Sequence, residues 1–187
     1  YELKASLNYL DKFDGVIFDL DGTLTNLDVD WKSVRTQIRD LFPSSINPFS
    51  FRADRNNHAP IYELARQHGL YEDLLDLLAS HEFDGTKNAV PLPLLDVIPN
   101  LDCPVGLCTK NSHIASQEIA EKFNVHFDSF ITRESTFEDK PNPLPLQKCI
   151  EDLELFPGNT LFIGNEKTDA ETAYGAGTNF LQVDQFY

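Results

Sequence analysis

The chain has 187 residues, of which 41% are hydrophobic, and a formal net charge of −15 at pH 7. This length and composition are typical of one globular domain, or of one domain that carries an inserted subdomain. The negative charge repels polyanions, so it argues against nucleic acid and anionic membranes as partners. No apolar run approaches the roughly 18 residues that indicate a membrane span.

The three cysteines, Cys103, Cys108 and Cys149, form no C-x-x-C pair. Their number and spacing favour neither a disulfide framework nor a zinc site, and we expect a reducing, cytoplasmic compartment. The chain begins at Tyr1 and contains no methionine, so its first residues do not reveal whether a targeting segment preceded them. For the assembly state we expect a monomer or a homodimer.

Five short apolar runs have the length of buried strands, and most of them lack the alternation of a half-exposed strand. They cover residues 16–18, 105–108, 130–131, 161–163 and 180–183. Helical spacings lie between the later runs, over residues 112–123, where Ser112 is a possible N-cap, and over 143–155. Strands that alternate with single helices predict an α/β fold with a doubly wound, Rossmann-like parallel sheet, which binds ligands at the carboxyl ends of its strands.

A long segment with a different pattern separates the first run from the second. It contains three helical spacings, over residues 30–42, 61–69 and 71–81. We predict that residues 26–90 form a small all-α cap inserted into an α/β core of residues 1–25 and 91–187. The basic residues of this insertion are expected to face solvent, although they are the first candidates for any contact between the cap and a substrate. Those considered are Lys32, Arg35 and Arg39 of the first helical spacing and Arg52, Arg55 and His58 of the loop after it.

Two aspartates, Asp19 and Asp21, directly follow the first apolar run in the stretch GVIFDLDGTLTN, residues 15–26. Two charges at the end of a buried strand are costly to desolvate, which indicates a chemical task. Asp19 can attack an electrophile as a nucleophile, while Asp21 transfers a proton to or from the leaving group. Repulsion between the neighbouring carboxylates predicts a divalent cation beside them. An EF-hand loop is excluded, because the preceding run is strand-like and no Glu ends the loop.

Four stretches together resemble the motifs of a known superfamily. FDLDGTLTN resembles the first motif of the haloacid dehalogenase superfamily, in the phosphatase branch that carries D-x-D-G-T. VGLCTKN resembles the second motif and contributes Thr109, and DKPNP resembles the third and contributes Lys140. LFIGNEKTDAETAYGAG resembles the fourth, a strand followed by an acidic loop and a helix rich in Ala and Gly. The motifs span essentially the whole chain, which is similar to phosphoglycolate-phosphatase-like and β-phosphoglucomutase-like members.

The resemblance implies a phosphatase that hydrolyses a small phosphorylated metabolite, a phosphate monoester, through an aspartyl-phosphate on Asp19 with Mg²⁺ as cofactor. It implies catalytic roles for Asp19, Asp21, Thr109 and Lys140, and a Mg²⁺ site at Asp19, Asp21, Asn165 and Asp169. It implies phosphate binding by Asp19, Gly22, Thr23, Thr109, Lys110, Asn111 and Lys140. These residue types suit the task, because amides of Lys110 and Asn111 at a helix start attract anions and Lys140 supplies a fixed positive charge.

One position departs from the pattern of the superfamily. The fourth motif usually reads G-D-x-x-x-D, and this chain has Asn165 where the metal-binding carboxylate is expected. Asn165 offers only a neutral oxygen to Mg²⁺, so weaker metal binding and activity are expected, and a helix N-cap is an equally good role for it. A catalytically weakened binding or regulatory protein and a sugar-phosphate mutase therefore stay open as alternatives. A receiver domain is disfavoured because it lacks an inserted cap, and dehalogenase chemistry because that branch lacks the second aspartate of D-x-D.

Overall fold

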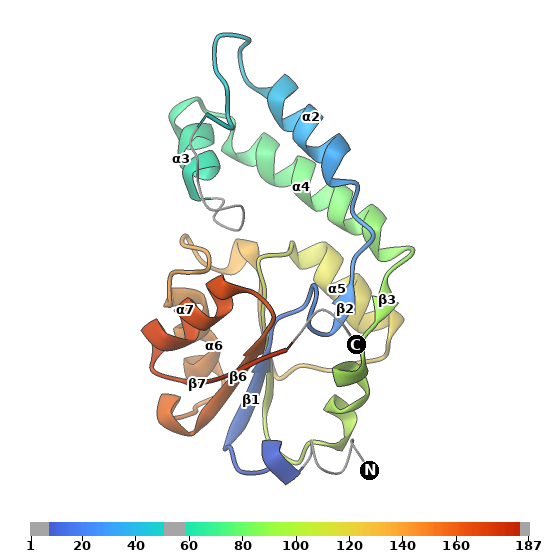
Figure 1. Ribbon diagram of the computed structural model, residues 1–187, viewed down its shortest axis with the longest axis vertical. Helices are drawn as coiled ribbons and strands as arrows, with labels where there is room; N and C mark the ends of the chain where they lie inside the picture. The colour runs from blue at the N-terminus through green and yellow to red at the C-terminus, as the bar shows by residue number, and fades with distance from the viewer. Residues whose placement is uncertain (1–7, 51–58, 184–187) are drawn as a thin grey trace.

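The computed structural model describes residues 8–50 and 59–183. At its centre lies a sheet of five parallel strands in the order β5-β4-β1-β6-β7 (Figure 1). The strands are β1 Gly15–Phe18, β4 Val105–Cys108, β5 Ser129–Ile131, β6 Thr160–Gly164 and β7 Asn179–Gln182. Each of the five predicted runs forms one of these strands, and the prediction of a doubly wound α/β sheet is confirmed.

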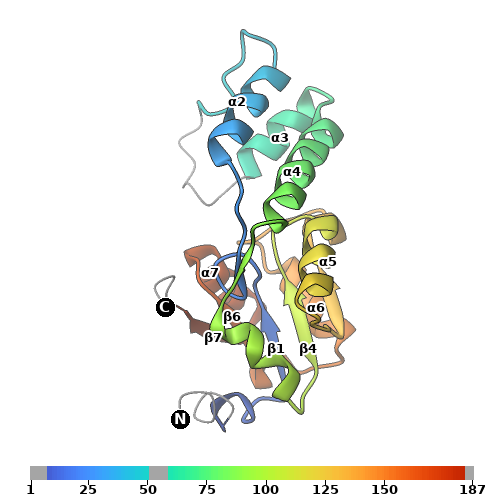
Figure 2. The same ribbon diagram turned by 90° about the vertical axis from the view of Figure 1, so that its right-hand side faces the viewer.

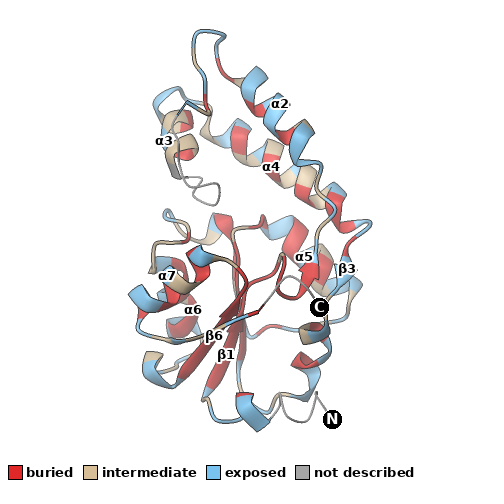
Figure 3. Ribbon diagram, viewed as in Figure 1, coloured by how far each residue is buried: buried red, intermediate tan, exposed pale blue. Residues whose placement is uncertain are grey.

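Helices cover both faces of the sheet, which explains why its strands do not alternate apolar and polar residues. Helix α5, His113–Lys122, covers one face. Helices α6, Leu144–Asp152, and α7, Lys167–Ala176, cover the other. Val16 and Phe18 of β1 pack in one apolar cluster with Ile119 of α5, whereas Ile17 packs in a second cluster with side chains of α6 and α7. Figure 3 shows the resulting burial of the strands between the two helical layers.

Short 3₁₀ helices complete the described part of the core. They are η1 Pro93–Asp96, η2 Ile98–Asn100, η3 Arg133–Ser135 and η4 Pro157–Asn159. The sequence did not predict them, because a single turn has no hydrophobic period. Within residues 8–50 and 59–183, no helix combines the length and the apolar character needed to cross a membrane.

The insertion, residues 26–90, contributes three helices that lie together beyond the carboxyl ends of the strands (Figures 1 and 2). They are α2 Trp31–Leu41, α3 Ala59–Gln67 and α4 Tyr71–Thr86. These helices share an apolar cluster of their own, which includes Val34, Ile38 and Leu74. Helix α4 continues beyond the predicted end at residue 81, because its last turn is buried through Glu82, Gly85 and Thr86, which carry no apolar signal.

The chain enters and leaves the insertion through a pair of short antiparallel strands. Strand β2, Thr25–Asn26, pairs with β3, Val90–Pro91, and the Thr25 hydroxyl donates to the Val90 carbonyl at 2.8 Å. The sequence did not predict this pair, because two residues are too few for a strand signal. The limits proposed for the insertion, residues 26 and 90, thus lie opposite each other in one ladder.

The two isoleucines of α5 provide a test of this packing. Ile119 is 1% exposed and packs on the sheet, whereas Ile114 is 52% exposed on the same helix. We expect Ile119→Ala to lower the free energy of unfolding by about 2–5 kcal/mol. Ile114→Ala is the matched control and is expected to change it by less than about 0.5 kcal/mol. Urea denaturation followed by circular dichroism measures both, and equal losses would contradict the described packing.

Candidate active site

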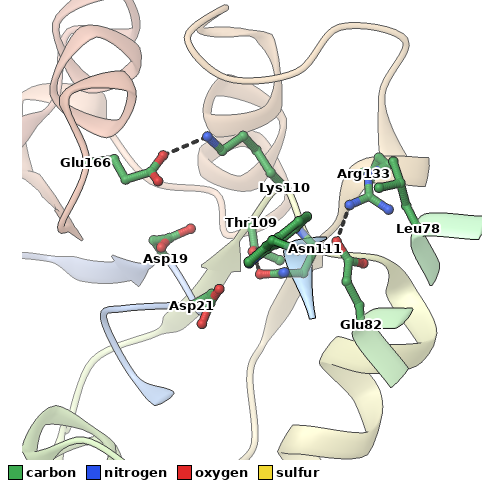
Figure 4. A pocket seen from close by; sticks show the side chains of 10 residues that line it. Asp19, Asp21, Leu78, Glu82, Thr109, Lys110, Asn111, Arg133 and Glu166 are labelled. Carbon is green, nitrogen blue, oxygen red and sulfur yellow. Dashed lines mark hydrogen bonds and ion pairs between the residues drawn. The ribbon is translucent and has the colours of Figure 1, made fainter. Parts of the chain in front are cut away.

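A small cavity lies where the insertion meets the carboxyl ends of the strands (Figure 4). It encloses about 90 Å³. The core lines it with Asp19, Asp21, Thr109, Lys110, Asn111, Arg133 and Glu166, and the insertion with Trp31, Leu78 and Glu82. Strand β1 lies between β4 and β6, where successive connections run to opposite sides, and this reversal is the expected place for a ligand in a doubly wound sheet.

Asp19 is linked to a buried lysine directly behind the cavity. The Nζ atom of Lys140 lies 2.6 Å from Asp19 Oδ1 and 2.6 Å from Asp169 Oδ1. Burial acts to lower the pKa of Lys140, but the carboxylates of Asp169 and Asp19 outweigh it and hold this pKa well above its ordinary value. Lys140 is therefore a permanent positive charge, as the sequence predicted, although it reaches the cavity only through Asp19.

Burial also dominates the acidity of Asp19. It raises the pKa of Asp19 to about 7, even though the charge of Lys140 acts in the opposite direction. The neighbouring carboxylate of Asp169 raises this pKa further. Asp19 thus needs more positive charge than Lys140 supplies if it is to be fully ionised near neutral pH.

Asp21 is the second carboxylate at the end of β1. The backbone N–H of Leu27 donates to Asp21 Oδ1 at 2.8 Å, which fixes the side chain at the start of the insertion. Burial raises the pKa of Asp21 to about 6, against the effect of the Leu27 N–H, and the charges of Glu82 and Glu166 raise it further. A group with this pKa can hold and release a proton near neutral pH.

The loop after β4, residues 109–111, contains two hydrogen bonds between its own first and last residues. The Thr109 hydroxyl donates to Asn111 Oδ1 at 2.8 Å, and the Asn111 N–H donates to Thr109 Oγ1 at 3.1 Å. Lys110 extends across the cavity mouth, where its Nζ atom lies 2.7 Å from Glu166 Oε2. All three residues line the cavity together, which is the arrangement expected of a phosphate-binding loop.

The N-terminus of α5 differs from the expectation. Helix α5 begins at His113, and its first amides already bind two carboxylates: Ser112 N–H donates to Glu82 Oε2 at 2.8 Å, and His113 N–H donates to Glu134 Oε2 at 2.9 Å. Ser112 occupies the predicted N-cap position, but its side chain makes no capping hydrogen bond. Lys110 therefore contributes to the cavity as a loop residue and not as the first turn of a helix.

Gly22, Thr23 and Asn165 form a close contact beside Asp19. Gly22 has a φ of +80°, and a Cβ atom there would lie 2.2 Å from Asn165 Nδ2, so only glycine fits. The Thr23 hydroxyl lies 3.2 Å from Asn165 Oδ1 and 3.4 Å from Asp19 Oδ2. These three residues, selected for phosphate or metal binding, lie behind the lining of the cavity and support Asp19 from one side.

Asp169 does not face the cavity. Its Oδ1 atom accepts from Lys140, and its Oδ2 atom accepts from the N–H groups of Asn165 at 3.1 Å and Glu166 at 2.9 Å. The Asp169 carboxylate therefore holds Lys140 and the turn between β6 and α7. Glu166, an acid of the same motif outside the predicted metal set, lines the cavity in its place. In the described ranges, no three His, Cys, Asp or Glu side chains gather as possible ligands of one metal ion.

The carboxylates of Asp19 and Asp21 still fit a hard divalent cation. Both line one cavity, and burial raises the pKa of each, so a cation beside them would stabilise their ionised forms. Mg²⁺ commonly binds through one or two carboxylates and completes its shell with water and phosphate oxygens. Two acidic ligands are therefore sufficient for this ion.

The side chains that the insertion contributes to the cavity are not the basic residues named as candidates for substrate contact. Lys32, Arg35 and Arg39 are exposed and lie outside the cavity lining, as expected for a solvated face. Arg52, Arg55 and His58 lie outside the described residues. Trp31 and Leu78 line the cavity instead, together with Glu82 and the core residue Arg133. A sequence offers little signal for such contacts, since Leu78 also has the spacing of a core residue.

The comparisons with known proteins agree with this arrangement. The sequence model of the haloacid dehalogenase-like hydrolase family matches residues 16–183. A phosphoglycolate phosphatase of Cereibacter sphaeroides is 26% identical over 191 residues, which cover 92% of this chain and 86% of that protein. A solved structure of a HAD-superfamily hydrolase, subfamily IA, from Geobacter sulfurreducens is similar with a TM-score of 0.63 and 20% identity, covering 91% of this chain and 89% of that one. CbbY from Rhodobacter sphaeroides, solved in complex with phosphate, is similar with a TM-score of 0.64 and 16% identity, covering 94% and 88%.

The pKa of Asp21 predicts how stability changes with pH in metal-free buffer. Because this pKa is raised from 3.8 to about 6 on folding, the folded state binds the proton more tightly, and the stabilisation is complete below pH 4 and lost as the pH rises through 6. The Asp21→Asn variant has no carboxyl group to titrate there, so it does not lose stability in this way as the pH rises. Its free energy of unfolding relative to the wild type should increase by roughly 2–3 kcal/mol between pH 4 and pH 8.

Urea denaturation at the two pH values, with EDTA present, measures this difference. Asp40→Asn, on the exposed face of α2, is the control for loss of a carboxylate elsewhere. A stability difference between Asp21→Asn and the wild type that does not change with pH would contradict the buried setting of Asp21.

Proposed function

The chain belongs to the haloacid dehalogenase-like hydrolase family, and from this premise we propose that it is a Mg²⁺-dependent phosphatase that hydrolyses a small phosphate monoester through an aspartyl-phosphate on Asp19. One observation carries the proposal: the Asp19 carboxylate lines a small cavity and has a permanently charged lysine 2.6 Å behind it. A carboxylate held in this way can attack phosphorus while the lysine offsets its charge.

The size of the cavity supports a small substrate. Its volume of about 90 Å³ is far below the several hundred Å³ of pockets that bind drug-sized molecules. It suits a phosphoryl group that carries a short organic part. The named activity of the relative from Cereibacter sphaeroides, a phosphoglycolate phosphatase, agrees with a substrate of this size.

In the first step of the proposed reaction, an Asp19 oxygen forms a bond to phosphorus and the bond from phosphorus to the ester oxygen breaks. Asp21 donates its proton to the departing alcohol. In the second step Asp21 takes a proton from water, water oxygen bonds to phosphorus, and the bond to Asp19 breaks to release phosphate. The pKa of about 6 suits Asp21 to both transfers.

The other residues of the site would hold charge and geometry. Lys140 stabilises the ionised Asp19, and Thr109 with the loop after β4 would bind the phosphoryl oxygens. Mg²⁺, held by the Asp19 carboxylate with Asp21 beside it, would supply positive charge to the transferred phosphoryl group, while Asp21 stays free to carry the proton. The Thr109 hydroxyl and the Asn111 amide must exchange their mutual hydrogen bonds for bonds to phosphate.

A binding or regulatory protein with weakened catalysis is the second candidate. The observation in its favour is Asn165, which places a neutral side chain beside Gly22 and Thr23 where a carboxylate was expected. A sugar-phosphate mutase would use the same first step and differ only in the acceptor of the phosphoryl group. Hydrolysis assays on the two variants described next distinguish the phosphatase from the binding or regulatory protein.

The role of Asp19 is tested by hydrolysis of para-nitrophenyl phosphate with Mg²⁺. Asp19→Asn removes the nucleophile and should lower kcat by at least about 10³-fold. Asp14→Asn is the matched control, because Asp14 is exposed at the opposite end of β1 and its loss should leave the rate unchanged. An equal rate for Asp19→Asn and the wild type would refute an aspartyl-phosphate at this position.

The role of Asn165 is tested by restoring the carboxylate. Asn165→Asp adds a negative charge beside Asp19 and should raise the affinity for Mg²⁺ by roughly tenfold. The titration can be followed by the fluorescence of Trp31, the only tryptophan of the chain, which lines the cavity. Asn47→Asp adds the same charge at an exposed position of the insertion and serves as the control. No gain in Mg²⁺ affinity or in hydrolysis rate would contradict the proposed metal position.

A further inference from the structure

Glu82 is a carboxylate of the insertion that is buried against the core. It is 1% exposed, near the end of α4. Its Oε1 atom accepts a hydrogen bond from Arg133 Nη2, and its Oε2 atom accepts one from the Ser112 N–H at 2.8 Å (Figure 4). Glu82 therefore joins α4 to two separate segments of the core through one side chain.

Both core partners of Glu82 belong to the support of the loop after β4. Ser112 directly follows the cavity-lining residue Asn111, and the backbone N–H of Arg133 donates to the Asn111 carbonyl at 3.1 Å. Glu82, Arg133 and the segment 111–112 thus form a closed ring of hydrogen bonds. This ring holds the end of the loop, whereas the Thr109 N–H donates to the Ile131 carbonyl at 3.0 Å and holds its start.

The charges make this ring depend on the position of the insertion. Glu82 is stabilised by the guanidinium of Arg133 and by the N-terminus of α5, whose first amide it binds. If α4 moved away, Arg133 and the Ser112 N–H would lose the carboxylate that they share, and the ring would open. The ring therefore exists in full only while α4 is docked on the core.

We propose that Glu82 is a positioning residue that couples docking of the inserted helices to the geometry of the 109–111 loop, so that the loop binds phosphate well only while Glu82 is in place. This inference rests on the proposed function, because it assigns phosphate binding to that loop. It adds a means of regulation: a substrate that favours the docked insertion also completes its own binding site.

The structure offers two matched controls. Glu134 accepts from the next amide of α5, His113 N–H, but it is exposed and belongs to the core, so it does not connect to the insertion. Arg66 of α3 is the second control, since it connects the insertion to the core without touching residues 109–112. Its guanidinium carbon lies 4.3 Å from the ring centres of both Tyr71 and Phe137.

The central variant is the double substitution Glu82→Gln with Arg133→Met, which removes both charges and leaves no lone buried ion. The dissociation constant of inorganic phosphate, measured by titration calorimetry with Mg²⁺ present, is expected to rise at least about tenfold. KM should rise in parallel, while the melting temperature stays close to that of the wild type. Glu134→Gln and Arg66→Met should each keep the phosphate affinity within about twofold of the wild type.

Two results would overturn the inference. The first is a double variant whose phosphate affinity stays within twofold of the wild type. The second is an equal loss of affinity in Arg66→Met, which would show that general adhesion of the insertion is responsible. If the double variant does not fold, Glu82→Gln alone decides by the same affinity criterion. Failure of the proposed function has a different signature, namely a wild type that does not hydrolyse para-nitrophenyl phosphate.

Discussion

The contact of Lys140 with Asp19 and Asp169 is the interaction on which the site depends. It joins three places that are distant in the chain: the end of β1, the loop before α6 and the first turn of α7. One buried cation between two buried carboxylates leaves a negative charge in excess. Because such an excess is unfavourable in a low-dielectric interior, burial raises the pKa of Asp19 to about 7, and a further cation near Asp19 would stabilise the ionised form.

The sequence predicted the sheet well because its three central strands, β1, β4 and β6, are buried on both faces. Val16, Ile17 and Phe18 lie in two different clusters, so no polar residue interrupts the run. The residues directly after strands were predicted for the same reason, since carboxyl ends of parallel strands meet at one edge. Asp19, Asp21 and the loop at 109–111 therefore line the cavity as their positions implied.

The residues that the sequence did not predict depend on three-dimensional placement. Glu82 and Arg133 are 51 positions apart and contact each other only because α4 packs on α5. Asp169 and Glu166 are both acids of one turn, joined by reciprocal capping bonds. The rotation of α7 about β6 decides which of them faces the cavity. The local sequence does not reveal this rotation. In the structure, the contact with Lys140 accounts for Asp169 pointing into the core and away from the cavity.

The balance of charge in the cavity bears on how an acidic protein could bind the proposed phosphate ester. Four carboxylates line it, those of Asp19, Asp21, Glu82 and Glu166, against the two basic side chains of Lys110 and Arg133. Each base is paired with a glutamate, Lys110 with Glu166 and Arg133 with Glu82. The uncompensated charge is therefore concentrated on the two aspartates, where a divalent cation would offset it. The glutamate pairs keep the remaining charge neutral, so the field that a phosphoryl group meets is set by that cation and by Lys140.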